Sequence, residues 1–238
     1  MIIDGVLNLN KPQGMTSRQA LDRIRKLWGV KKAGHGGTLD PDATGVLLIC
    51  LGKATKLFDP LQKGTKSYKA TATLGITTDT FDASGQVLMT SSTEHISENQ
   101  IEFVLKNFVG KINQTVPIFS AVKYQGQPLY KIARQGKQIE NLPSRQVTIK
   151  SIEITSINLP KFVFRVDCSK GTYIRSLVSD AGKRLECGAI LSKLVRTRSG
   201  IFKLEDAYNL DSLEEGKITS NESVVPMNVV IEALKRVM

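Results

Sequence analysis

A glycine-rich segment, residues 34–45, carries the side chains best suited to chemistry. It reads Gly-His-Gly-Gly-Thr-Leu-Asp-Pro-Asp-Ala-Thr-Gly and places Asp40 directly before Pro41. Glycine admits backbone conformations that let a ligand approach closely, and a residue before proline is held extended. Such a loop can present one carboxylate to a cleft at a fixed geometry. On spacing alone, a tight turn between strands is the alternative, and neither phosphate-binding glycine pattern is present.

Apolar and alternating segments surround this loop and must position it. The patterns predict strands over residues 6–9, 46–51, 67–76, 147–157, 162–168 and 190–197. They predict helices over residues 17–28, which Ser17 would cap, 53–61, which Pro60 would disturb, 97–108, 174–185 and 227–237. Strands and helices mix without regular alternation, so we expect an α+β fold with a mainly antiparallel mixed sheet flanked by helices.

Residues 117–145 differ in character from the rest of the chain. Three prolines and two glycines interrupt them, and five basic residues are interleaved with Tyr124 and Tyr130. We interpret this segment as an arm inserted into one main domain, residues 1–205, with a short amphipathic piece over residues 129–134. Residues 206–238 are expected to form a short acidic extension with a terminal helix.

The composition is that of a basic globular protein. The 238 residues include 33 Lys and Arg against 22 Asp and Glu, a net charge of +11, and 41% are hydrophobic, which excludes a largely disordered chain. The positive excess lies in residues 1–70, 123–145 and 146–204, which favours a polyanionic partner such as nucleic acid. A basic protein without such a partner is the alternative.

Other features of the sequence indicate the compartment. The three cysteines form no CxxC pair, which argues against a disulfide framework or a zinc site and fits a reducing cytosol. We see no signal peptide and no apolar run long enough to span a bilayer. The sequence therefore predicts a cytoplasmic protein without a membrane partner.

Six motifs in one order identify a known family. They are residues 10–17 (NKPQGMTS), the 34–45 segment, residues 66–70 (KSYKA), 78–85 (TDTFDASG), 117–126 (PIFSAVKYQG) and 168–175 (CSKGTYIR). Together they resemble the TruB-type pseudouridine synthases over residues 5–205. The resemblance implies the pseudouridine synthase fold and isomerisation of the T-loop uridine, position 55, of tRNA. It also implies that neither a cofactor nor a metal is needed.

The resemblance assigns roles to particular residues. Asp40 would be the catalytic carboxylate and Arg175 its ionic partner. Tyr68 would be a further catalytic residue, whose ring stacks on the target uracil and whose hydroxyl is a candidate for proton transfer. His35, Tyr173 and Leu194 would line the base pocket. Lys11 and Asp82 would also belong to the substrate-binding residues, Lys11 as a buttress of the catalytic loop and Asp82 as a buttress of its own loop or a residue that faces RNA. From the residues alone, Arg175 could be a surface arginine, Tyr68 a half-buried strand aromatic and Leu194 a core residue.

The resemblance also implies a partner and a mode of recognition. The enzyme would flip the target base out of the T-arm stem-loop and recognise the folded RNA by shape and phosphate contacts. Phosphate contacts would come from five basic residues of the arm: Lys123, Lys131, Arg134, Lys137 and Arg145. We expect a monomer without the PUA domain that many relatives carry, and an RNA chaperone or RNA-binding module is the alternative function.

Overall fold

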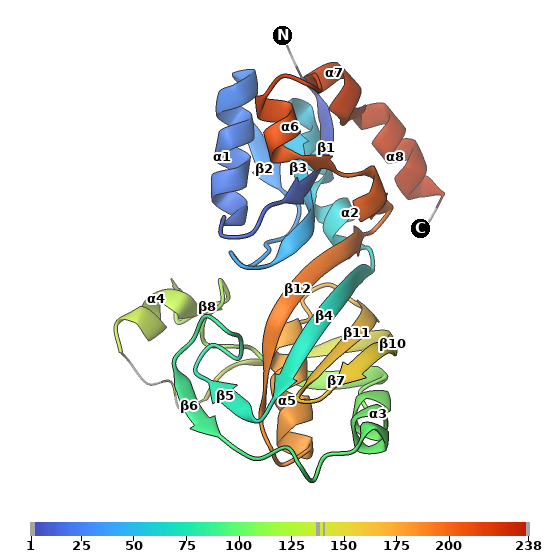
Figure 1. The fold of residues 1–238 in the computed structure, drawn as a ribbon. Helices are drawn as coiled ribbons and strands as arrows, with labels where there is room; N and C mark the ends of the chain where they lie inside the picture. Colours follow the sequence, from blue (N-terminus) through green and yellow to red (C-terminus); the bar gives the residue numbers. More distant parts are fainter. Residues whose placement is uncertain (1–2, 137–138, 140, 237–238) are drawn as a thin grey trace. The chain divides into compact units, whose positions relative to one another are not determined.

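A computed structural model describes residues 3–136, 139 and 141–236, which form two compact units (Figure 1). Unit 1 contains Met1–Tyr68 and Leu194–Met238, and unit 2 contains Lys69–Lys193. Two strands, β4 (Lys66–Leu74) and β12 (Ala189–Ser199), contribute residues to both units. Each unit is described separately below.

Unit 1 is built on a mixed sheet with the order β14, β1, β3, β12. Strands β1 (Gly5–Lys11) and β3 (Thr44–Leu51) are antiparallel, whereas β12 runs parallel to β3 and β14 (Tyr208–Asn209) runs parallel to β1. The short strands β2 (Ala33–His35), β13 (Phe202–Lys203) and β15 (Val224–Pro226) pair with β3, β12 and β1. Segments from both ends of the chain therefore lie side by side in this sheet.

The alternation of side chains along β1 and β3 gives unit 1 its core. Val6, Val46, Leu48 and Cys50 are buried together with residues from the end of the chain, among them Val230 and Leu234. The helices of unit 1 are α1 (Ser17–Trp28), η1 (Gly52–Leu57), α2 (Phe58–Lys63), η2 (Leu204–Asp206), α6 (Leu210–Glu214), α7 (Ser220–Ser223) and α8 (Met227–Lys235). The sheet thus has apolar cover that the last segment of the chain helps to supply.

Two helix predictions in unit 1 need correction. Thr16, not Ser17, caps α1, because the Thr16 side chain accepts a hydrogen bond from the Gln19 amide and Gln19 bonds back to Thr16. The segment over residues 53–61 is a 3-10 helix followed by α2, and Pro60 does not end it. Proline is tolerated there because the first turn of a helix needs no intrahelical N–H donors.

In unit 2, the strands of the sheet follow the order β12, β4, β11, β10, β7. Strands β7 (Gly110–Thr115), β10 (Ser144–Asn158) and β11 (Lys161–Cys168) are antiparallel neighbours. Helices α3 (Glu98–Lys106) and α5 (Ile174–Arg184) pack on each other and on this sheet. Phe162, Phe164 and Val166 alternate with more exposed residues of β11 and form part of the buried face.

Two small hairpins complete unit 2. Strands β5 (Ile76–Thr78) and β6 (Val87–Thr90) form one ribbon, and β8 (Lys123–Tyr124) and β9 (Gln127–Pro128) form the other. Helix α4 (Leu129–Arg134) follows the second ribbon and matches the amphipathic piece predicted there. Strand β6 was not predicted, and neither was β7.

The α+β class and the mixed sheet flanked by helices are confirmed. The division of the chain at residue 205 stays a prediction, while β14, β15 and α8 beyond that point belong to unit 1. Within the described ranges, no helix is long and apolar enough to cross a membrane.

Candidate functional site

Residues 36–43 connect β2 to β3 and are called the Asp40 loop below. Ser17, the first residue of α1, reaches it: the Ser17 hydroxyl accepts from the Leu39 amide at 2.8 Å and donates to the Leu39 carbonyl at 3.0 Å. After the loop turns, the Ala43 amide donates to the Asp40 carbonyl at 3.1 Å. The backbone on both sides of the Asp40 side chain is therefore fixed by hydrogen bonds.

Lys11, the last residue of β1, supports the Asp40 loop from inside unit 1. Its side chain is fully buried, and Nζ donates to the carbonyls of Pro12 (2.8 Å), Met15 (2.6 Å) and Pro41 (2.9 Å). Burial lowers the pKa of Lys11 to about 8, although the nearby carboxylates of Asp42 and Asp40 act in the opposite direction. These contacts are those of a loop buttress, and a contact of Lys11 with substrate stays a prediction.

A buried arginine that the sequence analysis missed lies at the other side of the Asp40 loop. Arg196 of β12 is only 2% exposed, and its guanidinium donates to the carbonyls of Val46 (2.7 Å), Gly37 (3.2 Å) and Thr38 (3.5 Å). The sequence offered no clear signal, because Arg196 shares β12 with other polar residues such as Lys193 and Arg198. Arg196 is easily read as an exposed residue of the strand's polar face, because arginine is rarely buried.

His35 stands at the end of β2, directly before the Asp40 loop, and is half-buried. Burial lowers the pKa of His35, and the charges of Arg196 and Arg18 lower it further, so the imidazole is neutral at pH 7. Its Nδ1 atom is buried without a hydrogen-bond partner in the described part of the chain. The contact of His35 with a flipped nucleotide stays a prediction.

Tyr68 and Leu194 lie on the two strands that contribute to both units. Tyr68 of β4 is buried, with 8% of its surface exposed, and Leu194 of β12 is half-buried. Both belong to unit 1, as Asp40 does. Their predicted contacts with the uracil ring are not tested by the structure.

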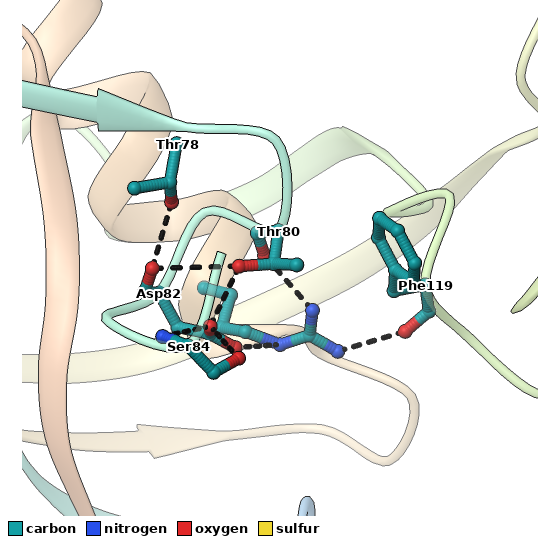
Figure 2. Close-up of polar contacts among 6 residues, drawn as sticks. Thr78, Thr80, Asp82, Ser84 and Phe119 are labelled. Atoms are coloured by element: carbon teal, nitrogen blue, oxygen red, sulfur yellow. Dashed lines mark hydrogen bonds and ion pairs between the residues drawn. The ribbon is translucent and has the colours of Figure 1, made fainter. Parts of the chain in front are cut away.

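Arg175 and the turn that contains Asp82 form a polar cluster in unit 2, which Figure 2 shows. Arg175 lies in the first turn of α5 and is only 4% exposed, which excludes a surface arginine. Its guanidinium donates to the carbonyls of Thr80 (2.9 Å) and Phe119 (3.1 Å), and Nε lies 3.5 Å from Oδ2 of Asp82. The predicted pairing of Arg175 with Asp40 stays a prediction.

Asp82 organises the turn around itself. Its Oδ1 atom accepts hydrogen bonds from the Thr80 hydroxyl (2.7 Å), the Ser84 amide (3.0 Å) and the Ser84 hydroxyl (2.6 Å). The Asp82 carbonyl accepts from the Thr78 hydroxyl at 2.7 Å. These bonds agree with the expectation that Asp82 buttresses its own loop, and a contact of Asp82 with RNA stays a prediction.

Tyr173, which precedes α5, is clamped by two residues that face each other across β7 and β10. The side-chain amide of Gln114 accepts from the Tyr173 N–H at 2.7 Å and donates to the Tyr173 carbonyl at 2.9 Å. Arg145 stands opposite Gln114 in the sheet, and its guanidinium lies 5.1 Å from the centre of the Tyr173 ring. Gln114 is almost fully buried and was not predicted, since a polar strand residue gives no sign of its partner.

Comparison with known proteins identifies the family. A profile described as the N-terminal domain of TruB family pseudouridylate synthase matches residues 25–174, and one described as the tRNA pseudouridylate synthase B C-terminal domain matches residues 175–238. The first match alone covers more than half of the chain. The chain belongs to the TruB family of pseudouridylate synthases.

Individual members of the TruB family are similar over most of the chain. The tRNA pseudouridine synthase B of Syntrophotalea carbinolica is 44% identical over 212 residues, which cover 89% of this chain and 69% of that protein. The protein of the same name from Clostridium tetani is 41% identical over 235 residues, which cover 99% of this chain and 80% of that protein.

One solved structure contains a chain with the same fold as this TruB family member. A chain in the crystal structure of a Cbf5-Nop10-Gar1 complex superposes with a TM-score of 0.73 at 34% sequence identity. The superposition covers 96% of this chain and 61% of that chain, so this chain spans less than two thirds of the solved one. The expected pseudouridine synthase fold is therefore confirmed.

The arm of this TruB family member presents basic side chains to solvent. Lys123 of β8 and both Lys131 and Arg134 of α4 are exposed, and the Arg134 guanidinium lies 5.7 Å from the centre of the Tyr130 ring. Lys137 lies outside the described residues. Arg145 belongs to β10 and not to the hairpin and helix of the arm, and it contacts Tyr173 as described above.

Metal binding has no visible support in the described ranges, where no group of three or more His, Cys, Asp or Glu side chains is placed to hold an ion. Catalysis without a metal or cofactor stays a prediction for this TruB family protein.

Proposed function

We propose that this protein isomerises a uridine of tRNA to pseudouridine and that its target is the T-loop uridine at position 55. The reaction breaks the N1–C1′ bond, rotates the uracil and forms the C5–C1′ bond, while the proton lost from C5 is balanced by one gained at N1. Family membership supports the reaction, and the curated relatives are named for tRNA. The observation that carries the proposal is the Asp40 loop, whose backbone is bonded to side chains from β1, α1 and β12.

Asp40 is proposed as the catalytic carboxylate. A carboxylate can attack C1′ or C6 covalently, or assist a glycal-like pathway, and these routes remain alternatives for this protein. A rigid loop favours each of them, because a carboxylate held at the reacting carbon needs no further ordering in the transition state. Tyr68 is proposed to stack on the uracil and Arg175 to balance the carboxylate charge.

The T-arm of tRNA is proposed as the RNA element that the protein binds. The net charge of +11 favours a polyanion, and the exposed Lys123, Lys131 and Arg134 are suited to phosphate contacts. The target base must leave the stacked loop, which costs a few kcal/mol, and these contacts can offset that cost. We further propose that the protein acts as a monomer in the cytoplasm.

The test uses an unmodified tRNA transcript and the full chain. After incubation, carbodiimide labelling and primer extension map any pseudouridine to a nucleotide. We expect one stop in the T-loop with the wild type and with Asp59→Asn, an exposed aspartate on α2 that serves as a matched control. With Asp40→Asn we expect no stop, because the amide can neither attack nor carry negative charge.

The outcomes separate the functions. If the wild type binds the transcript tightly but produces no stop, the isomerase proposal is wrong and an RNA chaperone or binding module is favoured. A stop elsewhere in the tRNA would overturn the choice of position 55 and leave the isomerase intact. Activity retained in Asp40→Asn would remove Asp40 from the catalytic role.

A further inference from the structure

Arg196 is a permanently charged side chain in the interior of unit 1. Arginine stays protonated at every physiological pH, and a buried charge is costly unless it is well hydrogen-bonded. In the described part of the chain, the hydrogen bonds of Arg196 all go to backbone carbonyl oxygens. The Arg196 guanidinium therefore orders a specific set of backbone carbonyl groups.

These backbone groups lie at both ends of the Asp40 loop. Nη2 and Nη1 reach the carbonyls of Gly37 and Thr38, which are three and two residues before Asp40. Nε reaches the carbonyl of Val46, which follows the loop in β3. A planar guanidinium presents its donors in a fixed fork, so one side chain sets the separation of the two ends.

The backbone of Arg196 is itself held close to the loop. Arg196 pairs with Gly45 in the parallel contact between β12 and β3. Gly45 has a φ of 99°, and a Cβ atom at this position would lie 2.3 Å from the Arg196 carbonyl oxygen. Only glycine permits this approach, which fixes the point from which the guanidinium extends.

We propose that Arg196 is a positioning residue that sets the geometry of the Asp40 carboxylate. Arg196 fixes the backbone before Asp40, Ser17 fixes Leu39, and Lys11 fixes Pro41 on the far side. Lysine cannot replace Arg196 in this role, because a single nitrogen does not reproduce the fork. The inference rests on the proposed function, and it assigns to Arg196 an effect on the chemical step and not on RNA affinity.

The test compares Arg196→Lys with a matched control, Lys66→Met. Lys66 is also a buried cation that donates to three backbone carbonyls, those of Leu61, Gln62 and Gly64, but these lie at the end of α2 and not in the Asp40 loop. The measurements are the single-turnover rate per folded protein, the Kd for the tRNA transcript and hydrogen exchange of the peptide covering residues 36–46.

We expect Arg196→Lys to slow the single-turnover rate by at least about tenfold, because a small misplacement of a catalytic group has effects of this size. The Kd should stay within about twofold, and exchange in residues 36–46 should accelerate relative to the rest of the chain. Lys66→Met should lower thermal stability while leaving the rate per folded protein and the exchange of residues 36–46 unchanged.

Equal rates per folded protein in Arg196→Lys and the wild type would overturn the inference, as would a loss explained by a weaker Kd. If Arg196→Lys does not fold, Arg196→Gln takes its place, since it removes the buried charge and keeps one amide donor. If neither variant folds, Arg196 is a structural residue and the proposal is wrong. A wild type without synthase activity would refute the proposed function, whereas unchanged exchange in residues 36–46 would refute the role of Arg196 independently.

Discussion

At the scale of single residues, the Asp40 loop is bordered by two buried cations, Lys11 and Arg196. Lys11 and Arg196 both donate to backbone carbonyls, and the charge of Arg196 contributes to the lowered pKa of Lys11. Burial lowers the pKa of Lys11 to about 8, so Lys11 can lose its proton within an experimentally accessible pH range. The geometry of the loop should therefore depend on pH through Lys11.

We expect the single-turnover rate to fall as the pH rises through about 8, the value to which burial lowers the pKa of Lys11. The neutral amine keeps two N–H donors for three carbonyl oxygens, so one contact to the loop is lost. Asp42→Asn should move the decline to lower pH, because the Asp42 carboxylate favours the charged form of Lys11. A pH–rate profile of both proteins checks this, and identical profiles would contradict it.

The lowered pKa of Lys11 affects the free energy of unfolding in the opposite direction from the single-turnover rate. Between pH 8 and the ordinary lysine value of 10.5, the unfolded chain holds a proton that the folded chain has released. The proton-linked contribution of Lys11 to the free energy of unfolding therefore increases with pH across this window. If the single-turnover rate declines over the pH range in which this contribution to the free energy of unfolding increases, the decline comes from a change in loop geometry and not from global unfolding.

Sequence reasoning at this scale found the residues with distinctive neighbours. The glycines and Pro41 drew attention to Asp40, and the family resemblance implied its catalytic role. The helix position of Arg175 favoured a surface side chain, and only the motif around it indicated a functional role. Arg196 and Gln114 were missed, because their importance lies in backbone carbonyls and amides that are distant in sequence. No spacing rule reports such partners.

At the scale of elements, the pair of strands β7 and β10 prepares the start of α5. Gln114 supplies to Tyr173 the donor and the acceptor that a neighbouring strand would supply, and Arg145 lies against the ring. Arg175 follows two residues later, so the clamp on Tyr173 also restrains the backbone that leads to it.

Gln114→Met should lower the free energy of unfolding by about 2 kcal/mol, because it leaves a backbone N–H and a carbonyl of Tyr173 without their partners. Asn113→Met, at the exposed neighbouring position of β7, is the control and should change it little. Urea denaturation measures both. Equal effects of the two variants would show that the Gln114 bonds do not contribute.

Neutralising the arm should weaken RNA binding in a salt-dependent way. Replacing Lys123, Lys131 and Arg134 by Gln is expected to reduce the slope of log K against log salt by roughly 0.7–0.9 for each phosphate contact that is lost. Titration of labelled tRNA at several salt concentrations measures the slope. If the slope does not change, these three side chains do not contact phosphate.

Elements with strong periodicity were predicted well, and those defined by pairing were not. The 129–134 helix agrees with α4, and the strand over residues 162–168 lies within β11. Strand β7 reads GKINQT and has few apolar residues, so only its pairing with β10 makes it a strand. The disturbing effect of Pro60 on the helix was overestimated, because the sequence does not reveal that Pro60 lies in the first turn of α2.

At the scale of the whole molecule, unit 1 depends on residues from both ends of the chain. Val230 of α8 is 1% exposed and lies in the cluster that includes Val6, Val46 and Leu48. Val230→Ala should lower the free energy of unfolding by about 2 kcal/mol, because it removes apolar contacts and leaves a cavity. The neighbouring Val229 is 47% exposed, and Val229→Ala is the control.

Calorimetric or urea unfolding checks this comparison. A similar, small effect of both substitutions would mean that α8 adds little to the stability of unit 1. The acidic character of residues 206–238 suggested only an extension, because a charge balance does not reveal that β14 and β15 pair with β1.

The division of the chain into two units also sets the order in which their strands are translated. Unit 2 is one uninterrupted stretch, Lys69–Lys193, so all of it has been translated before Arg196 is added to the chain. Strands β1 and β3 emerge first but must wait for β12, β14 and β15, and during this time their apolar faces and edges lack their partners. The inserted unit is thus translated before the last strands of unit 1, and the Asp40 loop obtains its guanidinium support only after most of the protein has been made.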